Sequence, residues 1–435
     1  MVELKLPRGM RDYPPEEKIL RDQLVDKLKR IFERYGFNPL ETPIVERWEV
    51  LSAKYAGGEE ILKETFRLRD QGGRELGLRF ELTTSLARFV ALNPKIKRPL
   101  KLYQIGPVFR DGPIKRGRLR QFWQCDVDII GARSLLAEAE LLNLTGDFFS
   151  ELGLEIEIRL NHRRLLRELI EPAVPEGVDP IEVILTLDKL EKLGREAVAE
   201  ELQQKGLSGE QSARLLELAD IQGTNEERIA RLRGLTQARS EALREIEELF
   251  GYLDRPEQVV FTPSLARGLA YYTGTVFEVY LKDLEPVASS LAAGGRYDEL
   301  IGRFLGSSEE VPAVGISFGL EPIMEVMKAR DRSRDEGLPR TKVELFVIPI
   351  GTVTVAESRQ IAQRLRRAGI NTDMDLVGRG VSANLEYANS YGIPYVLFVG
   401  PEELAQGKVK LRDMQTGEEA LLTVEELTKK LRPEG

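Results

Sequence analysis

The chain opens with apolar residues at helical spacing and then changes to strand-like alternation. Residues 16–35 carry one apolar face and are followed by Gly36, which predicts an amphipathic helix with a glycine cap. The stretches from Phe66 to Leu68 and ELGLRFELT alternate around the turn DQGGR, which predicts a pair of strands. LKLYQIGPVFR and FWQCDVDIIG alternate on either side of DGPIKRGRLRQ, and together they predict a long antiparallel hairpin with a basic tip.

The pattern changes twice more along the chain. Residues 163–256 are rich in Leu, Glu, Arg and Ala at helical spacing, which predicts a helical insertion, and strand patterns return after it. Residues 328–342 lack apolar periodicity and predict an exposed linker. Strands and helices then alternate over residues 343–435, which predicts a small α/β domain with a mostly parallel sheet. We therefore expect a first domain over residues 1–327, with the insertion inside it.

Composition narrows the classes of protein that fit. The 435 residues are 42% hydrophobic and 31% charged, which is globular composition and more chain than one core organises. No stretch approaches the roughly 18 apolar residues of a membrane span. The charged start MVELKLPRGMRDYPPEEK has no apolar signal region, so we expect a cytoplasmic protein with no membrane segment.

The counts of cysteine, histidine and charge exclude several kinds of site. Cys125 is the one cysteine, so the chain can form no internal disulfide. His162 is the one histidine, which excludes a Cys/His zinc site and excludes a catalytic triad unless His162 supplies the base. Its setting, RLNHRRLL, favours a structural or solvated role. The net charge of −8 argues mildly against nucleic acid, but PIKRGRLRQF is a local basic patch that is either a solvated face or a phosphate-binding one.

The predicted hairpin places a row of polar and aromatic side chains on one face, because positions two apart in a strand share a face. The opposite face holds Leu119, Trp123 and Val127, which suit packing. Arg110 ends the first strand, where it can bind a phosphate or carboxylate bidentately or form a surface ion pair with Asp111. A solvated face is the alternative to a pocket, and we favour the pocket. The row consists of Arg118, Arg120, Phe122, Gln124 and Asp128.

Two further stretches carry candidate side chains. Glu81 and Thr83 are two apart on the predicted strand FELT, where a carboxylate and a hydroxyl can hold an ammonium group or simply face solvent. Arg267, Tyr271 and Tyr272 precede the predicted strand TVFEVY. There they either pack in an ordinary way or supply a cation and two phenols to a pocket.

Six motifs in order along the chain resemble those of the histidyl-tRNA synthetases, a family of class II aminoacyl-tRNA synthetases. They are LPRGMRDYPPEE, TPIVE, LRFELTTSLARFVA, VFR…RGRLRQFWQCDVDIIG, LARGLAYYTGTVFEV and AAGGRYDEL. The likeness covers nearly the whole chain, and FELT and QCDVDIIG resemble the archaeal and eukaryotic branch. It implies an α+β fold, with an antiparallel catalytic sheet and flanking helices, a helical insertion and a C-terminal α/β anticodon-binding domain.

The resemblance also implies a reaction. ATP activates L-histidine to histidyl-adenylate, and the histidyl group passes to the 3′ end of histidine tRNA. Arg110 and Arg267 match the family's catalytic arginines, which offset the charge of a carboxylate meeting the α-phosphate. Mg²⁺ is expected to arrive with ATP, and no metal is expected on Cys or His.

Binding residues follow from the same resemblance. Glu81, Thr83 and Gln124 match groups that hold the α-amino group, whereas Asp128 and Tyr272 match those that read the imidazole. The whole implied histidine-binding set is Glu81, Leu82, Thr83, Arg110, Gln124, Asp128, Arg267, Tyr271 and Tyr272. The implied ATP-binding set is Arg110, Arg118, Arg120, Phe122, which would stack on adenine, and Arg267.

The family's partners are implied as well. TPIVE places Pro43 near the interface of a homodimer, and the C-terminal domain would bind tRNA. Candidate tRNA contacts there are Arg379, Asn384, Lys408, Lys410 and Arg412.

Three positions depart from the family pattern. Ala270 replaces an acid, Pro322 stands where an arginine that grips the γ-phosphate is expected, and Gly112 stands where an acid contacts adenine. Arg118 is a candidate to bind the pyrophosphate end instead. Two alternatives to an active ligase therefore stay open. One is a non-catalytic relative, such as the regulatory subunit of ATP phosphoribosyltransferase, that binds histidine or a partner enzyme. The other is a tRNA-binding protein that has lost activation.

Overall fold

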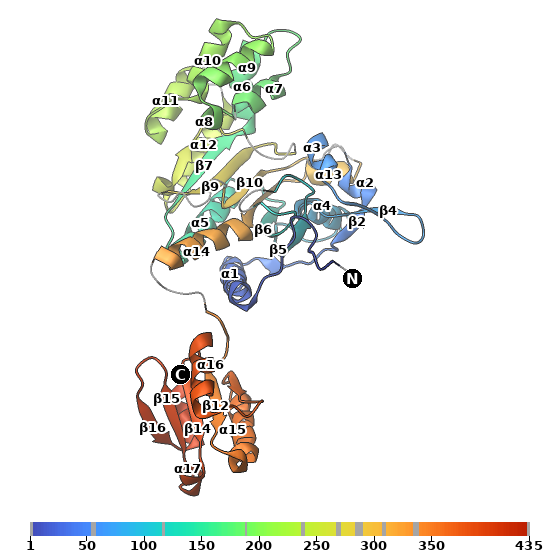
Figure 1. Cartoon of the computed structure of the whole chain (residues 1–435). Coiled ribbons are helices and arrows are strands. Elements are labelled where there is room, and N and C mark those ends of the chain that lie inside the picture. The colour runs from blue at the N-terminus through green and yellow to red at the C-terminus, as the bar shows by residue number, and fades with distance from the viewer. Residues whose placement is uncertain are drawn as a thin grey trace. The chain divides into compact units, whose positions relative to one another are not determined.

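We describe a computed structural model of the chain. It describes residues 3–53, 58–114, 118–187, 189–235, 240–266, 271–282, 290–306, 310–333 and 339–432. The chain divides into two compact units, and each is described by itself (Figure 1). The first consists of residues 1–11 and 24–330, and the second of residues 12–23 and 331–435. No helix among these described ranges is long and apolar enough to cross a membrane.

A largely antiparallel sheet forms the centre of the first unit. Within the described residues it has eight strands in the order β1-β5-β6-β11-β10-β9-β7-β8, and only the edge strands β1 and β8 pair in parallel. The predicted hairpin is confirmed as its longest pair, β5 and β6, in which Val108 lies opposite Phe122. The strands are β1 (Asn38–Pro39), β5 (Leu100–Phe109), β6 (Gln121–Ile130), β11 (Ala313–Gly319), β10 (Ala292–Arg296), β9 (Thr275–Leu281), β7 (Ile156–His162) and β8 (Val259–Phe261).

Helices cover one face of this sheet and leave the other face for a site. The Phe32 ring of α1 (Pro15–Arg34) lies 5.4 Å from the Tyr103 ring of β5. The Phe148 ring of α5 (Leu136–Glu151) lies 5.4 Å from the Phe318 ring of β11. The predicted first helix is thus confirmed, and it ends at Arg34, shortly before Gly36, whose φ of 79° suits glycine. Helix α14 (Leu320–Ser333) follows β11 and ends inside the segment predicted to be a linker.

A second, small sheet corrects one prediction. Strand β4 (Glu75–Leu78) pairs with β2 (Val45–Arg47) and β3 (Arg67–Arg69), and it ends before Phe80. FELT is therefore not a strand, because α4 (Thr83–Leu92) begins at Thr83 and buries Leu86 and Val90. The helical spacing of these apolar residues outweighs the short alternation before them. Nearby helices are α2 (Trp48–Leu51), α3 (Gly58–Lys63) and α13 (Leu300–Phe304).

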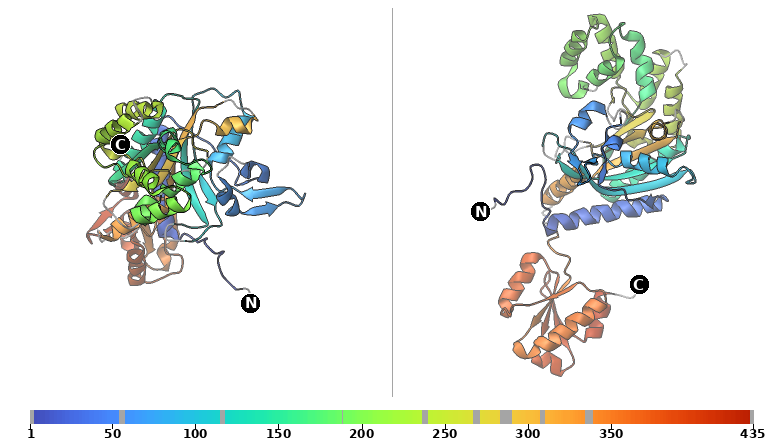
Figure 2. Two further views of the ribbon diagram at one scale, coloured as in Figure 1. Left: turned by 90° about the horizontal axis from the view of Figure 1, so that it is seen from above. Right: turned by 90° about the vertical axis from the view of Figure 1, so that its right-hand side faces the viewer.

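Helices fill the sequence between β7 and β8, as the Leu-rich pattern predicts. Most of them form the compact green group in Figures 1 and 2, and Val183, Leu202 and Leu215 lie in its core. They are α6 (Arg163–Ile170), α7 (Pro180–Leu187), α8 (Leu190–Leu193), α9 (Arg195–Gln204), α10 (Gly209–Ala219), α11 (Asn225–Leu235) and α12 (Glu241–Gly251).

The second unit is a mixed sheet between helices (Figure 2). Its strand order is β13-β12-β14-β15-β16, in which the first three strands are parallel and the last two antiparallel. Leu345 and Val347 pack with α15 and α18, and Phe346 and Ile348 pack with α16, so β12 is buried on both faces. The elements are β12 (Leu345–Pro349), α15 (Val355–Arg367), β13 (Thr372–Met374), α16 (Val381–Tyr391), β14 (Tyr395–Val399), α17 (Pro401–Ala405), β15 (Val409–Asp413), β16 (Glu419–Leu422) and α18 (Val424–Leu431).

Candidate active site

A cavity of about 670 Å³ opens on the face of the central sheet opposite to Phe318. Alternate residues of β6 line it, since Phe122, Gln124, Asp126 and Asp128 share one face, while Cys125 and Val127 are buried on the other. The loop before α4, the end of β5 and the strands β9, β10 and β11 supply the rest of the lining. Its volume is in the range of small-molecule sites, about 300–1,000 Å³.

Glu81 is a buried carboxylate at the wall of this cavity. Thr84 Oγ1 donates to its Oε1 (2.5 Å), and Tyr271 Oη donates to its Oε2 (3.3 Å). Burial raises its pKa to about 7, although these hydrogen bonds and the charge of Arg110 work in the opposite direction. A carboxyl group with such a pKa gains most from a cation brought by a ligand.

Asp128 lies further along β6, and its carboxylate accepts a hydrogen bond from a tyrosine. Tyr297 Oη donates to its Oδ1 at 2.6 Å. Burial raises the pKa of Asp128 to about 7, which the Tyr297 bond partly offsets and the charge of Glu81 reinforces. Gly315 lies directly opposite in β11, where a Cβ would stand 1.9 Å from Asp128 Oδ1. Only glycine leaves room for this carboxylate.

Asp126 lies on the same face of β6 as Asp128, and its Oδ1 has no hydrogen-bond partner among the described residues. Burial first, and then the charge of Asp128, raise the pKa of Asp126 well above its usual range, while a hydrogen bond with Ser317 lowers it. Gln124 Nε2 donates to Ser317 Oγ at 2.9 Å, and Gln124 Oε1 is buried without a partner. Two acceptors in one cavity thus lack a donor.

Arg110 brings positive charge to the same cavity. Its Nε donates to the Phe80 carbonyl oxygen (3.0 Å), and its guanidinium carbon lies 5.2 Å from the centre of the Phe122 ring. Burial lowers the pKa of Arg110, whereas the nearby Glu81 raises it. Arg118 also lines the cavity, is about half exposed and pairs with Glu64 (3.4 Å). Two guanidinium groups in this cavity are therefore available to bind an anion.

Tyr271 and Tyr272 line the cavity from another part of the chain, and their rings meet edge to face at 5.0 Å. Burial raises the pKa of both hydroxyl groups, so they stay neutral donors. Thr83 also lines the cavity. Most of the predicted set is thereby brought together from three separated segments.

Three predicted residues stand apart from the cavity or cannot be placed. Arg120 pairs with Asp111 (2.6 Å), donates to the Gly112 carbonyl oxygen and packs on Gly9, and it does not line the cavity. Leu82 is buried and does not line it either. Arg267 lies outside the described residues, as does the neighbouring Ala270.

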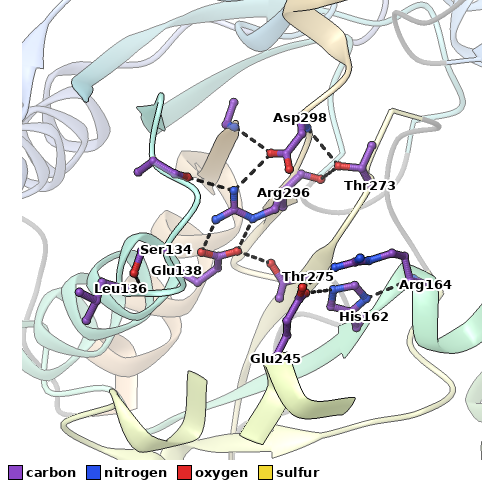
Figure 3. A network of polar contacts seen from close by, with 12 residues as sticks. Ser134, Leu136, Glu138, His162, Arg164, Glu245, Thr273, Thr275, Arg296 and Asp298 are labelled. Carbon is purple, nitrogen blue, oxygen red and sulfur yellow. Dashed lines mark hydrogen bonds and ion pairs between the residues drawn. The ribbon is translucent and has the colours of Figure 1, made fainter. Parts of the chain in front are cut away.

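A buried polar network fixes the strand end that carries Tyr297 (Figure 3). Arg296 binds Glu138 through two hydrogen bonds of 2.6 Å and Asp298 through one of 3.2 Å. Thr275 Oγ1 donates to the same Glu138 carboxylate (3.0 Å). Because Tyr297 lies between Arg296 and Asp298, the network sets the position of the hydroxyl group that Asp128 accepts.

His162 is fully buried beside this network and has a structural role (Figure 3). Its Nδ1 accepts from the Arg164 backbone N–H (3.2 Å), so it caps α6, and its Nε2 donates to Glu245 Oε2 of α12 (2.8 Å). Burial works to raise the pKa of Glu245, but the hydrogen bonds from His162 and Arg164 prevail and lower it to about 2. The solvated alternative for His162 is wrong, because packing encloses the ring.

Two remaining positions behave as structural residues. Pro322 lies in the first turn of α14, where its missing N–H breaks no helical hydrogen bond, and it does not line the cavity. Asn384 is buried in the second unit and donates to Asp375 Oδ2 (3.2 Å) and to the Arg379 carbonyl oxygen (3.0 Å). A buried side chain of this kind holds a loop rather than meeting a macromolecule.

Comparison with known proteins shows the family of the chain. The family model described as Histidyl-tRNA synthetase matches residues 9–323. The chain belongs to the histidyl-tRNA synthetase family. A second model, Anticodon binding domain, matches residues 344–434. The fold is accordingly that of a class II synthetase with an anticodon-binding domain, as predicted.

Individual relatives cover the chain from end to end. It is 42% identical to "Histidine--tRNA ligase 1" of Bacillus cereus, over 99% of this chain and all of that one. The crystal structure of histidyl-tRNA synthetase from Nostoc sp. PCC 7120 superposes with a TM-score of 0.86 at 30% identity, covering 99% of both chains. A Bacillus halodurans structure described as an ATP phosphoribosyltransferase regulatory subunit/histidyl-tRNA synthetase gives 0.73 at 26% identity, over 92% of this chain and 99% of that one.

Asp126, Tyr297 and Ser317 are among the cavity residues that sequence reasoning missed. Asp126 obeys the same period of two as Gln124 and Asp128, so the strand pattern alone could have included it. Tyr297 stands in the motif AAGGRYDEL, and its signal was a tyrosine inside a strongly matching motif. Ser317 had no comparable signal. Among the described residues no group of His, Cys, Asp and Glu is arranged to hold a metal ion.

Proposed function

We propose that this protein activates L-histidine with ATP and transfers the histidyl group to the 3′ end of histidine tRNA. One observation carries the proposal: the buried acids Glu81, Asp126 and Asp128 share a cavity with Arg110 and the Phe122 ring. An amino acid offers an ammonium group, a carboxylate and a side chain. The acids suit the ammonium and the N–H groups of an imidazole, whereas Arg110 suits the carboxylate.

Adenylate formation needs fixed cations more than it needs a base. A histidine carboxylate oxygen attacks the α-phosphorus of ATP, a new P–O bond forms, and the bond to the pyrophosphate oxygen breaks. Two anions meet in this step, and Arg110 lies where it can contact both. Mg²⁺ bound to ATP would bridge the phosphate oxygens. We assign Arg267 the part of a second cation, from the resemblance alone.

The remaining roles follow from position in the cavity. Phe122 presents its ring for stacking on adenine, and Arg118 is the nearest candidate for the pyrophosphate end. Asp128 and Tyr272 are assigned to the imidazole. Both ring nitrogens then have partners, and an apolar side chain of similar size would leave a buried acid unpaired at a cost of about 1–3 kcal/mol.

The assembly is part of the proposal. We assign residues 1–327 to the catalytic domain and residues 343–435 to a domain that binds tRNA. The segment around Pro43 would form a homodimer interface, and the protein would act in the cytoplasm.

The second step of the reaction places the terminal ribose hydroxyl of tRNA against the histidyl carbonyl carbon, and AMP leaves.

The regulatory-subunit alternative is not favoured. A regulatory subunit of that type is expected to lack an anticodon-binding module, whereas the anticodon-binding family model matches residues 344–434 of this chain. Two curated relatives that are 42% identical to this chain are also named histidine–tRNA ligases.

The test is ATP–pyrophosphate exchange with each of the twenty amino acids in turn. We expect exchange with histidine alone. Arg110→Ala should lower the exchange rate by about 10²–10³-fold, the range found for removal of one charge-stabilising donor. Arg69→Ala, on the exposed strand β3, is the matched control and should leave it unchanged. A folded protein that binds histidine and exchanges with no amino acid would contradict the proposal and favour the regulatory alternative.

A further inference from the structure

Among the described residues, three buried acids line the cavity, and their neighbours there do not satisfy every carboxylate oxygen. Glu81, Asp126 and Asp128 are each at least 97% buried and all line it. Glu81 accepts from Thr84 and Tyr271, and Asp128 accepts from Tyr297. Within the part of the chain that the structure describes, Asp126 accepts from the Ser317 hydroxyl, and its Oδ1 has no partner.

Arg79 and Arg110, the described arginines whose charges act on Asp126, do not fill this gap. Arg79 affects Asp126 through space, but its own hydrogen bonds go to the Thr42 and Pro107 carbonyl oxygens, at 2.7 and 2.9 Å. Arg110 is committed at Nε to the Phe80 carbonyl oxygen. A buried carboxylate oxygen without a donor is costly, so its presence calls for a donor from outside the protein.

Gln124 shows the same lack. Its Nε2 donates to Ser317 Oγ at 2.9 Å, and its Oε1 is buried with no partner. Ser317 therefore joins Gln124 and Asp126 and holds them side by side, while the two orphaned acceptors belong to residues that line one cavity. One of these two acceptor atoms belongs to a carboxylate. Together they suit a ligand group that carries a positive charge and several N–H donors.

We propose that Asp126 is a specificity residue that accepts a hydrogen bond from the α-ammonium group of the bound amino acid. It would act beside Glu81, Thr83 and Gln124, which the resemblance assigns to that group and all three of which line the same cavity. Asp128, already shared with Tyr297, is left for the imidazole. This inference rests on the proposed function and names an ammonium contact that the resemblance did not assign.

The ligand-free protein should show the cost of this arrangement. Burial and the charge of Asp128 raise the pKa of Asp126, so ionised Asp126 destabilises the fold until a cation arrives. Asp126→Asn keeps the shape and removes the charge. It should therefore raise the melting temperature of the ligand-free protein while weakening histidine binding, a pair of effects that a merely structural residue would not give.

The experiment compares two ligands that differ only at the ammonium group. L-histidine binding is measured by calorimetry, and 3-(imidazol-4-yl)propionate, which lacks the ammonium, is measured as a competitive inhibitor of histidine-dependent exchange. Asp126→Asn should weaken histidine about 10- to 100-fold, as expected for one hydrogen bond to a charged group, and change the inhibition constant of the propionate by less than about threefold. Asp128→Asn, on the same face of β6, is the matched control and should weaken both ligands by similar factors.

Two results would overturn the proposal: unchanged histidine affinity in Asp126→Asn, or equal losses for the two ligands together with a lower melting temperature. The wild-type protein separates this outcome from failure of the proposed function. If the folded wild type neither binds histidine nor exchanges, the proposed function itself is wrong.

Discussion

Glu81 should make the ligand-free protein less stable as the pH rises. Its carboxyl group is buried and has a pKa of about 7 in the folded chain, against 4.5 for an ordinary glutamate. Well below pH 4.5 the carboxyl group is protonated in both the folded and the unfolded chain, and it does not change the free energy of unfolding. As the pH rises, the unfolded chain ionises first, so stability falls progressively and the loss is complete once the pH has passed 7.

The magnitude follows from the two pKa values. Between pH 5 and pH 8 the folded state should lose about 2–3 kcal/mol relative to a chain without this group, at about 1.4 kcal/mol for each pH unit of the interval. Glu81→Gln removes the ionisable group and keeps an oxygen for Thr84. The variant should therefore gain about that much stability over the wild type on going from pH 5 to pH 8.

Urea unfolding followed by tryptophan fluorescence measures this directly. The chain has two tryptophans, Trp48 and Trp123, and both lie in the first unit, so the signal reports the unit that contains Glu81. Glu46→Gln is the control, because Glu46 is buried but paired with Arg88 at 2.6 Å, and its loss should lower stability at pH 8. A Glu81→Gln variant whose advantage does not grow with pH would refute the reasoning.

Three further predictions concern single residues. Arg267→Ala should collapse pyrophosphate exchange while affecting histidine binding less, and exchange at the normal rate would show that Arg267 has another role. Gly315→Ala should displace Asp128, whose Oδ1 would lie 1.9 Å from the new Cβ, and calorimetry should show weaker histidine binding; unchanged affinity would mean that Asp128 is not a contact. His162→Ala should lower stability by about 1–3 kcal/mol by breaking the bond to Glu245, with exchange unaffected below the melting temperature; lost exchange in a stable variant would contradict a structural role.

Local periodicity predicted the β5–β6 hairpin, which forms part of the cavity wall, and helix α1, which covers the other face of the sheet. The β5–β6 hairpin follows the alternation of apolar and polar residues that predicts strands. Helix α1 ends shortly before Gly36, as expected of a helix with a glycine cap. The prediction of a strand at FELT was wrong because four alternating residues cannot be distinguished from the residues that precede a helix. Helix α4 begins at Thr83. Glu81 nevertheless lines the cavity, since the loop before α4 places it there.

Contacts between distant segments lie beyond such patterns. Tyr297 and Asp128 are 169 residues apart in the chain, and no period of two or 3.6 relates them. His162 lies in a basic stretch, which suggests that its side chain is exposed to solvent. Glu245 of α12, more than eighty positions later, nevertheless binds the buried ring. Arg120 belongs to the predicted row, but the chain turns before β6 begins at Gln121, so its side chain goes to Asp111.

The most direct test of the account is aminoacylation of tRNA by the full-length protein with radiolabelled histidine and ATP. The account predicts that histidine tRNA becomes charged, that charging requires ATP, and that Arg110→Ala abolishes it without unfolding the protein. A wild-type protein that binds histidine in the cavity between Asp128 and Arg110 but leaves tRNA uncharged would contradict the account.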